Sequence, residues 1–530
     1  MTRVFVVWDD SHLWGLLVLR YLRALGLPHE ILRAHDIAEG ALSGKCGAFG
    51  GFPGVCAPSA PSDPEASPST APAPPAGDPS LLIVPGGWAR GKALRLGEAG
   101  LEAIRGFVAR GGSYLGFCGG AGLALTSPGG PRPGESLGLC PWGRMGFAGR
   151  LQHFLSGDVR LGLCAGDPLS LPGATETLAQ VWWPGQFAPP ARHHVDKNGV
   201  GDDGVQVLAR YAGLGPDFWV ADLALSRFPE EALSDWENLY GLQVRPDFLT
   251  GRPAVISGQY GAGRYVLSYP HLETPDSPQA NAWLAHLLAG LTAAPSPSPI
   301  TPLSESAPAP SPSPAPTPAP TPAPTPASSP AFEHAPQARR VVIPPWHVGQ
   351  ESAQVGAPAP WPDAALSQAK AGLEEAIGLG QDHLLLFWRN PWLLGWRRGV
   401  PGPGINSVYA LVCEALSRPA PTPDSSAELF WREHSEDFAR LATLFCKGLS
   451  GLLLAERLDM TVRQTPGVDG ADDMFSKNLR DMRSALFGPP PAAGGVCGQL
   501  LGLLEELCAR LWEQNGGDAT HEYSHAPSLG

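Results

Sequence analysis

Paired cysteines, long apolar runs and positive charge are all scarce in this chain of 530 residues. Its nine cysteines are loosely spaced, which argues against a disulfide framework or a structural zinc site and favours reduced thiols in a cytoplasm. No apolar run approaches 18 residues, so we expect no transmembrane helix and no membrane partner. The first residues show no signal peptide. The net charge of −13 disfavours nucleic acid as a partner.

Proline, in contrast, is abundant and is concentrated in two tracts. Residues 57–80 are rich in Pro, Ser and Ala and predict a disordered insert, because such a composition cannot bury a core. Residues 293–335 predict an extended linker that could hold two domains about 100 Å apart. The chain therefore divides into a domain over residues 1–292, a helical domain over 336–515 and a disordered tail over 516–530.

A single cysteine stands in a cluster of glycines. The apolar residues 113–117 predict a strand that delivers Cys118 into a sharp turn, and an apolar stretch follows it. Such a turn needs small neighbours, which Gly116, Gly119 and Gly120 supply. A helix beginning there would favour the thiolate form of the cysteine. The pattern fits a nucleophile, and it equally fits a buried cysteine in a Gly-rich turn.

A His-x-Glu pair follows a second strand-like run, residues 265–269. Residues two apart in an extended chain point to the same side, so Glu273 can lie beside His271 and orient its ring. A cysteine, a base and an orienting carboxylate together have the logic of a nucleophilic triad. The sequence therefore predicts Cys118, His271 and Glu273 as catalytic residues.

Short apolar strands alternate with helical patterns through the first 120 residues. This order predicts an α/β fold with a doubly wound parallel sheet, in which ligands bind at the C-terminal ends of the strands. The Pro-Gly-Gly turn at residues 85–87 and Cys118 fall at such ends, and His271 follows another. Residues 135–260 are turn-rich and predict β structure that faces the substrate.

Three smaller features each leave two interpretations. Residues 9–12 either line the same cleft or cap the first helix, with Ser11 as its N-cap, and we favour capping. The Trp-Trp pair in residues 181–187 packs in the core or forms an apolar wall over the cysteine. Residues 193–196, His-His-Val-Asp, form a solvated loop or bind a metal, and we favour the loop.

The last third of the chain has apolar residues at helical spacing, as in residues 438–453 and 500–511. It predicts a helical domain without a recognisable catalytic motif. Its Trp-rich segment, residues 383–394, packs inside this domain or against a partner. We expect this domain to be the one that binds a protein partner.

Three segments of the first domain resemble the biotin-protein ligase N-terminal domain family, a branch of the class I glutamine amidotransferase-like superfamily with a flavodoxin-like sheet. Residues 81–89 look like its Pro-Gly-Gly turn, residues 104–125 like its helix, strand and cysteine elbow, and residues 263–273 like its closing strand and histidine motif. The resemblance implies a Cys-His-Glu triad. It also implies an oxyanion or substrate-binding site formed by the following residues: Gly86, Gly87, Trp88 and Gly119.

The sequence departs from the family pattern at three points. Gly122 stands where glutamine amidotransferases carry a glutamine, and Leu272 replaces a proline. No biotin-ligase signature appears downstream, which argues against biotin ligation. We therefore predict a cysteine-dependent hydrolase for a small amide-type substrate, with no cofactor and no metal. The alternative is a non-catalytic ligand-binding, regulatory or scaffold module that retains the fold.

Overall fold

The computed structural model describes residues 3–43, 80–126, 135–145, 155–190, 203–220, 223–240, 247–293, 361–390, 392–397, 402–464, 473–488 and 494–515. The predicted insert, apart from Ser80, and the predicted linker, apart from Ala293, lie outside these residues. The predicted tail lies outside them as well.

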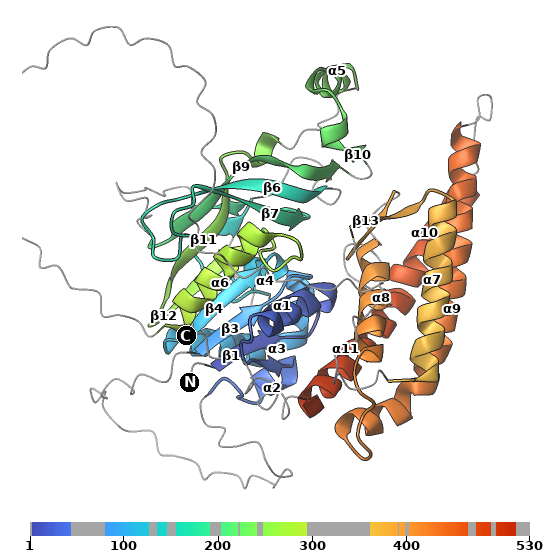
Figure 1. The fold of residues 1–530 in the computed structure, drawn as a ribbon, viewed down its shortest axis with the longest axis horizontal. Helices are drawn as coiled ribbons and strands as arrows, with labels where there is room; N and C mark the ends of the chain where they lie inside the picture. The colour runs from blue at the N-terminus through green and yellow to red at the C-terminus, as the bar shows by residue number, and fades with distance from the viewer. Residues whose placement is uncertain are drawn as a thin grey trace, which may run out of the picture.

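The first half of the chain is built on one ten-stranded sheet (Figure 1). Five of its strands are parallel, in the order β2-β1-β3-β4-β12. Their bounds are Arg3–Val7 (β1), Glu30–Leu32 (β2), Ser80–Val84 (β3), Ser113–Phe117 (β4) and Gly263–Ser268 (β12). The strand predicted over residues 113–117 is present as β4, and β1 and β3 are further short apolar strands of the kind that the sequence predicts.

Helices cover both faces of this parallel region, as the doubly wound prediction requires. Val4 and Val6 of β1 pack in one buried cluster with α1 (His12–Ala24) and α6 (Pro278–Thr292). Phe5 and Val7 point the other way, because side chains alternate along a strand, and pack with α2, α3 and α4. Those three helices span Ala34–Ala38, Ala89–Ala109 and Gly119–Leu123. The predicted α/β class is confirmed.

The other strands make the sheet mixed, so the predicted doubly wound parallel region is one part of a larger sheet. Beyond β12 the order continues β11-β9-β6-β7 with antiparallel pairing, and β10 pairs with β9. β11 turns directly into β12 between Tyr260 and Gly263, and a tight turn of this kind joins only antiparallel strands. The bounds are Leu155–Leu163 (β6), Glu176–Trp182 (β7), Gln206–Val220 (β9), Leu223–Ala224 (β10) and Pro253–Tyr260 (β11).

Smaller elements complete this half. Gly143–Arg144 (β5) pairs with Phe187–Ala188 (β8), and Glu230–Tyr240 forms α5. Two short 3-10 helices, Leu225–Arg227 (η2) and Asp247–Leu249 (η3), lie between β10 and β11.

The second half is helical, as the sequence predicts. Its helices are Ala364–Asp382 (α7), Gly402–Leu416 (α8), Ser426–Gln464 (α9), Asp473–Phe487 (α10) and Gly495–Asn515 (α11). The Trp-rich segment forms a hairpin of β13 (Leu386–Asn390) and β14 (Leu393–Trp396), in which Trp392 and Trp396 are buried. Of the apolar residues predicted for the helical core, Leu444 is exposed.

Helix α9 is the one described helix whose length and hydropathy would suit a membrane span, over Ser426–Val462. Core helices of soluble proteins meet the same criterion, and 39% of its most apolar window is buried inside the protein. Phe438, Phe445 and Leu449 are among the residues that pack in the core. Packing thus accounts for part of its apolar character.

The two halves pack against each other, with α8 and α11 beside α1 and α2 (Figure 1). Buried apolar residues of both halves belong to one continuous cluster. The Trp8 and Trp512 rings meet edge to face with centroids 4.9 Å apart. Arg389 of β13 donates to Ser156 and Asp217 in the sheet. The two halves are therefore in contact and not at the separation that the Pro-rich tract would permit.

A buried carboxylate provides a test of this interface. Glu414 of α8 is 1% exposed and pairs with Arg20 and Arg23 of α1 and with Arg418. Burial opposes its charge, but the three guanidinium groups hold the pKa of Glu414 well below its usual range. Glu414→Gln should lower the free energy of unfolding at pH 7 by about 3 kcal/mol, because it leaves buried arginines unpaired.

Urea denaturation would measure this loss, with Glu98→Gln as the control, since Glu98 is exposed in its pair with Arg105. A group with a depressed pKa stabilises the fold above its unfolded-state pKa and loses that contribution as the pH falls. The difference between wild type and variant should therefore shrink below about pH 4.5. Equal stabilities at pH 7 would contradict the prediction.

Candidate active site

Cys118 lies at the junction where β4 ends and α4 begins. Its backbone has φ 45° and ψ −102°, a conformation that non-glycine residues rarely adopt. Its N–H donates to the Ser268 carbonyl at 2.7 Å, which ties the junction to the end of β12. Such strain at a strand-to-helix turn is typical of a nucleophile elbow. Because α4 has only five residues, the contribution of its dipole is smaller than the sequence suggested.

The glycines around Cys118 allow backbone segments to touch. A Cβ on Gly119 would lie 2.1 Å from the carbonyl oxygen of Gly87, and one on Gly120 would lie 2.0 Å from that of Val84. A Cβ on Gly116 would meet the Gly120 backbone at 2.7 Å. Side chains at Gly119 and Gly120 are thus excluded by the end of β3 and the loop that follows it, and a side chain at Gly116 is excluded by the elbow itself, in agreement with the small neighbours required at the turn.

His271 and Glu273 follow β12 and face each other. Nδ1 of the imidazole lies 2.7 Å from Oε1 of the carboxylate, and the two residues are 1% and 0% exposed. Burial opposes the charged ring, but the Glu273 carboxylate and the Cys118 thiol outweigh burial and raise the pKa of His271 to about 10. The ring therefore interacts with both other members of the predicted triad and is protonated at neutral pH. Its Nε2 has no regular hydrogen bond among the described residues.

Two tryptophans border this group. The Trp14 ring of α1 stacks on the His271 ring, with centroids 4.0 Å apart and an interplanar angle of 23°. Trp182 lies 6.1 Å from Trp14, and its carbonyl oxygen is 3.8 Å from Sγ of Cys118. The apolar wall predicted from the Trp-Trp pair is thus partly met by Trp182. Trp14 was missed, because it stands in an ordinary apolar helix pattern.

The residues predicted to bind an oxyanion lie in the loop between β3 and α3 and at the elbow. Among the described residues, no acceptor bonds the N–H groups of Gly87 and Gly119. A Cβ on Gly86 would meet the His271 ring at 2.7 Å, so this residue packs on the base. Trp88 is half-buried and is the N-cap residue of α3. The N–H of Gly119 thus belongs to the residue after Cys118, and Gly87 packs against Gly119, whereas Trp88 starts α3.

A buried lysine behind the site was not predicted. Nζ of Lys92 donates to Oγ of Ser11 at 2.6 Å and to the Asp9 carbonyl at 3.2 Å. Burial lowers the pKa of Lys92 to about 8, against the opposing effect of nearby carboxylates such as Asp10. A lysine in the first turns of a helix is ordinarily expected to be exposed. The sequence did not predict its burial, because only the fold brings its acceptors together.

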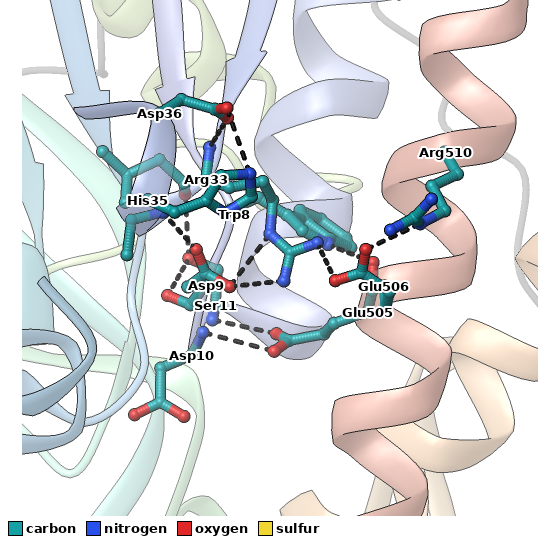
Figure 2. A network of polar contacts seen from close by, with 12 residues as sticks. Trp8, Asp9, Asp10, Ser11, Arg33, His35, Asp36, Glu505, Glu506 and Arg510 are labelled. Atoms are coloured by element: carbon teal, nitrogen blue, oxygen red, sulfur yellow. Dashed lines mark hydrogen bonds and ion pairs between the residues drawn. The ribbon is translucent and has the colours of Figure 1, made fainter. Parts of the chain in front are cut away.

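Residues 9–12 belong to the interface between the halves (Figure 2). Ser11 is the N-cap residue of α1, but its side chain makes no capping bond and donates to the Val7 carbonyl instead. Asp9 pairs with Arg33, and His12 pairs with Glu505 of α11. Both interpretations of this segment, as cleft wall and as helix cap, were therefore incomplete.

The metal interpretation concerns residues 193–196, which lie outside the described residues. Within the described ranges, no group of three His, Cys, Asp or Glu side chains is arranged to hold a metal ion.

Gly87 tests the close backbone contacts behind the site. Its φ is +114°, and a Cβ there would lie 2.2 Å from the Asp10 carbonyl oxygen. Gly87→Ala should cost about 3 kcal/mol of stability or more, from strain and from the clash with backbone. Gly26 is the matched control, because its φ is +68° just after the end of α1 but nothing lies within 4 Å of the added Cβ. Thermal unfolding should show Gly26→Ala losing only about 1–2 kcal/mol, and equal losses would contradict the contact.

His271 predicts a pH dependence of stability. A raised pKa stabilises the fold fully below the unfolded-state pKa, near 6.5, and this contribution is lost as the pH rises toward about 10. The stability gap between wild type and His271→Gln should thus narrow from pH 6.5 to pH 10, in urea melts at matched ionic strength. Glu273→Gln should remove most of the same dependence. A gap that does not change with pH would show that the imidazolium is not formed.

Solved structures give weak likenesses to about half of the chain. A candidate GMP synthase protein from Thermoplasma acidophilum is 12% identical, with a TM-score of 0.30, 55% of this chain covered and 94% of that one. The cytoplasmic protein STM1381 from Salmonella typhimurium LT2 is 12% identical, with a TM-score of 0.25, and the match covers 55% of this chain and 97% of that one. The β-galactosidase from Bacillus circulans gives 14% and 0.26, with 54% of this chain covered but only 30% of the enzyme. All three scores are below 0.5, so the fold assignment rests on the strand order alone.

A comparison with curated proteins found no match. The model of the biotin-protein ligase N-terminal family does match, over residues 71–127. This segment contains β3, the Pro-Gly-Gly turn, α3 and the Cys118 elbow, whereas His271 and Glu273 lie outside it. The family resemblance stated from the sequence is therefore confirmed for the part of the chain that carries the cysteine.

Proposed function

We propose that the first half of the chain is a cytoplasmic, cysteine-dependent hydrolase with amidotransferase-like chemistry, acting on a small amide-type substrate. One observation carries the proposal. Cys118 has a strained backbone at the end of β4, its thiol is one of the groups that raise the pKa of His271, and the buried Glu273 carboxylate lies against the other side of that ring. Strain of this kind persists only where the surrounding structure enforces it, and it clusters at active sites.

The proposed reaction proceeds in two steps. The Cys118 thiolate, stabilised by the His271 imidazolium, attacks the amide carbonyl carbon and forms an S–C bond. The imidazolium gives its proton to the nitrogen, the C–N bond breaks, and the amine leaves. Water then attacks the thioester while His271 accepts its proton, the S–C bond breaks, and the acid and the thiolate are released. Glu273 holds the ring and stabilises its charge throughout.

The N–H groups of Gly87 and Gly119 are suited to stabilise the oxyanion of the tetrahedral intermediate. Both lack an acceptor among the described residues, and their two backbones are in contact. Fixed donors of this type act without reorganisation and are worth about 3–4 kcal/mol each. Gly122 stands where glutamine amidotransferases carry a glutamine, so the side chain of that pattern is missing here. An added Cβ at Gly122 would meet only Ala89. We therefore favour an amide other than glutamine, and no biotin ligation.

The second candidate function is a non-catalytic ligand-binding or regulatory module. The burial of His271 and Glu273 favours it, since a packed relic would bury the pair just as well. The two candidates differ in the reactivity of the sulfur, because a nucleophile must be reached by a small electrophile and a relic need not be.

Alkylation by iodoacetamide at pH 7, followed by peptide mapping, tests the proposal. Cys118 should label about tenfold faster than the other described thiols, because burial raises the pKa of all six of them. His271→Ala should slow this labelling about tenfold, since an unassisted thiol is only a few per cent thiolate at pH 7. Ammonia release from a panel of primary carboxamides, compared with that of Cys118→Ser, would then identify the substrate class.

His286→Ala is the matched control, because His286 is a histidine of the same half that bonds the Pro168 carbonyl away from the site. It should leave the labelling of Cys118 unchanged. If Cys118 labels no faster than the buried thiols, or if His271→Ala has no effect, the hydrolase proposal is wrong and the binding module is favoured.

A further inference from the structure

A carboxylate from the helical half is buried in the loop that joins β1 to α1 (residues 8–12). Glu505 of α11 is 4% exposed, and its two oxygens accept the N–H groups of Asp10, Ser11 and His12 at 3.3, 3.1 and 2.8 Å. Nδ1 of His12 lies 2.7 Å from the same carboxylate, and Nε1 of Trp8 donates to the Glu505 carbonyl at 2.7 Å. Figure 2 shows the acid reaching across to the loop from its helix.

The β1–α1 loop depends on this acceptor for its conformation. Asp10 and His12 have φ values of 57° and 45°, which cost about 1–3 kcal/mol each in non-glycine residues. The N–H of Ser11 also donates to the Trp8 carbonyl at 3.1 Å, but the N–H groups of Asp10 and His12 would be buried without an acceptor, which would add a further penalty. The Glu505 carboxylate therefore stabilises a strained loop that the first half of the chain does not satisfy by itself.

The loop in turn supports the candidate active site from behind. The Asp10 carbonyl oxygen packs on Gly87, where an added Cβ would lie only 2.2 Å from it. Gly87 packs in the same way on Gly119, next to Cys118. The N–H of Trp14 donates to the Ser11 carbonyl at 3.0 Å, and the Trp14 ring stacks on His271. The loop thus supports the nucleophile through Gly87 and Gly119, and it supports the base through Trp14.

We propose that Glu505 is a positioning residue of the first half's active site, supplied by the helical half, so that the helical half completes the site. This inference rests on the proposed function for its chemical meaning, although its geometry does not. Glu505 touches no reacting group and acts through the β1–α1 loop. It explains why a helical domain without catalytic motifs is packed so closely on the first half.

The charges around the loop agree with this role. Burial opposes the negative charge, but His12 and Lys92 outweigh it and lower the pKa of Glu505 to about 2. Burial likewise opposes charge on His12, and Glu505 raises the pKa of His12. Asp9 and Asp10 are the other acids that act on Lys92. The acid is thus ionised at neutral pH and balances cations that the sheet domain buries.

The full-length chain with Glu505→Gln tests the proposal. The variant keeps the shape of the side chain, removes its charge and brings an NH₂ group against the loop donors. Hydrogen–deuterium exchange should rise in peptides covering residues 8–15 and 84–92. Iodoacetamide labelling of Cys118 at pH 7 should fall about tenfold, as expected when a reacting group is displaced. Glu505→Asp keeps a carboxylate and should recover a large part of the rate.

Two controls separate positioning from loose packing. Glu506→Gln changes the next residue, whose partners are Arg33 and Arg510. Glu414→Gln removes a buried ion pair from the same interface without contact to the loop. Both should leave Cys118 labelling within about twofold of wild type. If Glu505→Gln is too unstable to purify, the Cys118 labelling rates of Glu505→Asp and Glu414→Gln are compared instead.

The outcomes distinguish this inference from the hydrolase proposal. If Glu505→Gln labels Cys118 at the wild-type rate or faster, the inference is wrong and the hydrolase proposal stands. If wild-type Cys118 labels no faster than the buried thiols, the hydrolase proposal is wrong. Exchange at residues 84–92 then still decides whether Glu505 orders the loop: increased exchange in Glu505→Gln alone supports that role, and unchanged or generally increased exchange rejects it.

Discussion

The candidate site depends on backbone packed directly against backbone. The Asp10 carbonyl lies against Gly87, and the Gly87 carbonyl lies against Gly119, at separations that leave no room for a Cβ. These contacts bring the ends of β1, β3 and β4 together and hold Cys118 in a conformation that an unconstrained chain would leave. His271 follows β12, the strand that pairs with β4, and the Cys118 thiol helps to raise the pKa of its ring. The arrangement of the site thus follows from steric exclusion before any charge is considered.

Much of this half could be predicted from local patterns. Residues 113–117 form the predicted strand, and the glycines after them are required by contacts of the kind that the turn implied. His271 and Glu273 lie side by side because alternation along an extended segment is a local property. The antiparallel strands after residue 150 were not predicted as part of the same sheet, because pairing between distant segments leaves no periodic signal.

What escaped prediction is mainly polar and distant in sequence. Lys92, Glu414 and Glu505 look like surface charges on amphipathic helices. The burial of Glu414 and Glu505 is explained by partners across the interface, and that of Lys92 by Ser11 and Asp9, which are distant from it in sequence. Trp8 and Arg389 likewise acquire their roles from the other half of the chain. The Pro-rich composition between the halves indicates a spacer, yet it says nothing about whether the joined parts touch. The sequence likewise does not tell whether a tryptophan packs at the interface or in the core, because both kinds stand in the same apolar pattern.

The contact between Trp8 and Glu505 joins one of the first strands of the chain to its last described helix. During synthesis at about 5–20 residues per second, the segment around Cys118 would leave the ribosome roughly 20–80 s before that helix. Throughout this interval the β1–α1 loop lacks the Glu505 carboxylate as its acceptor. In a nascent or truncated chain, the loop that supports the Cys118 turn would therefore not be ordered. The order of translation would thereby delay this contact, and the ordering of the loop, until α11 has been made.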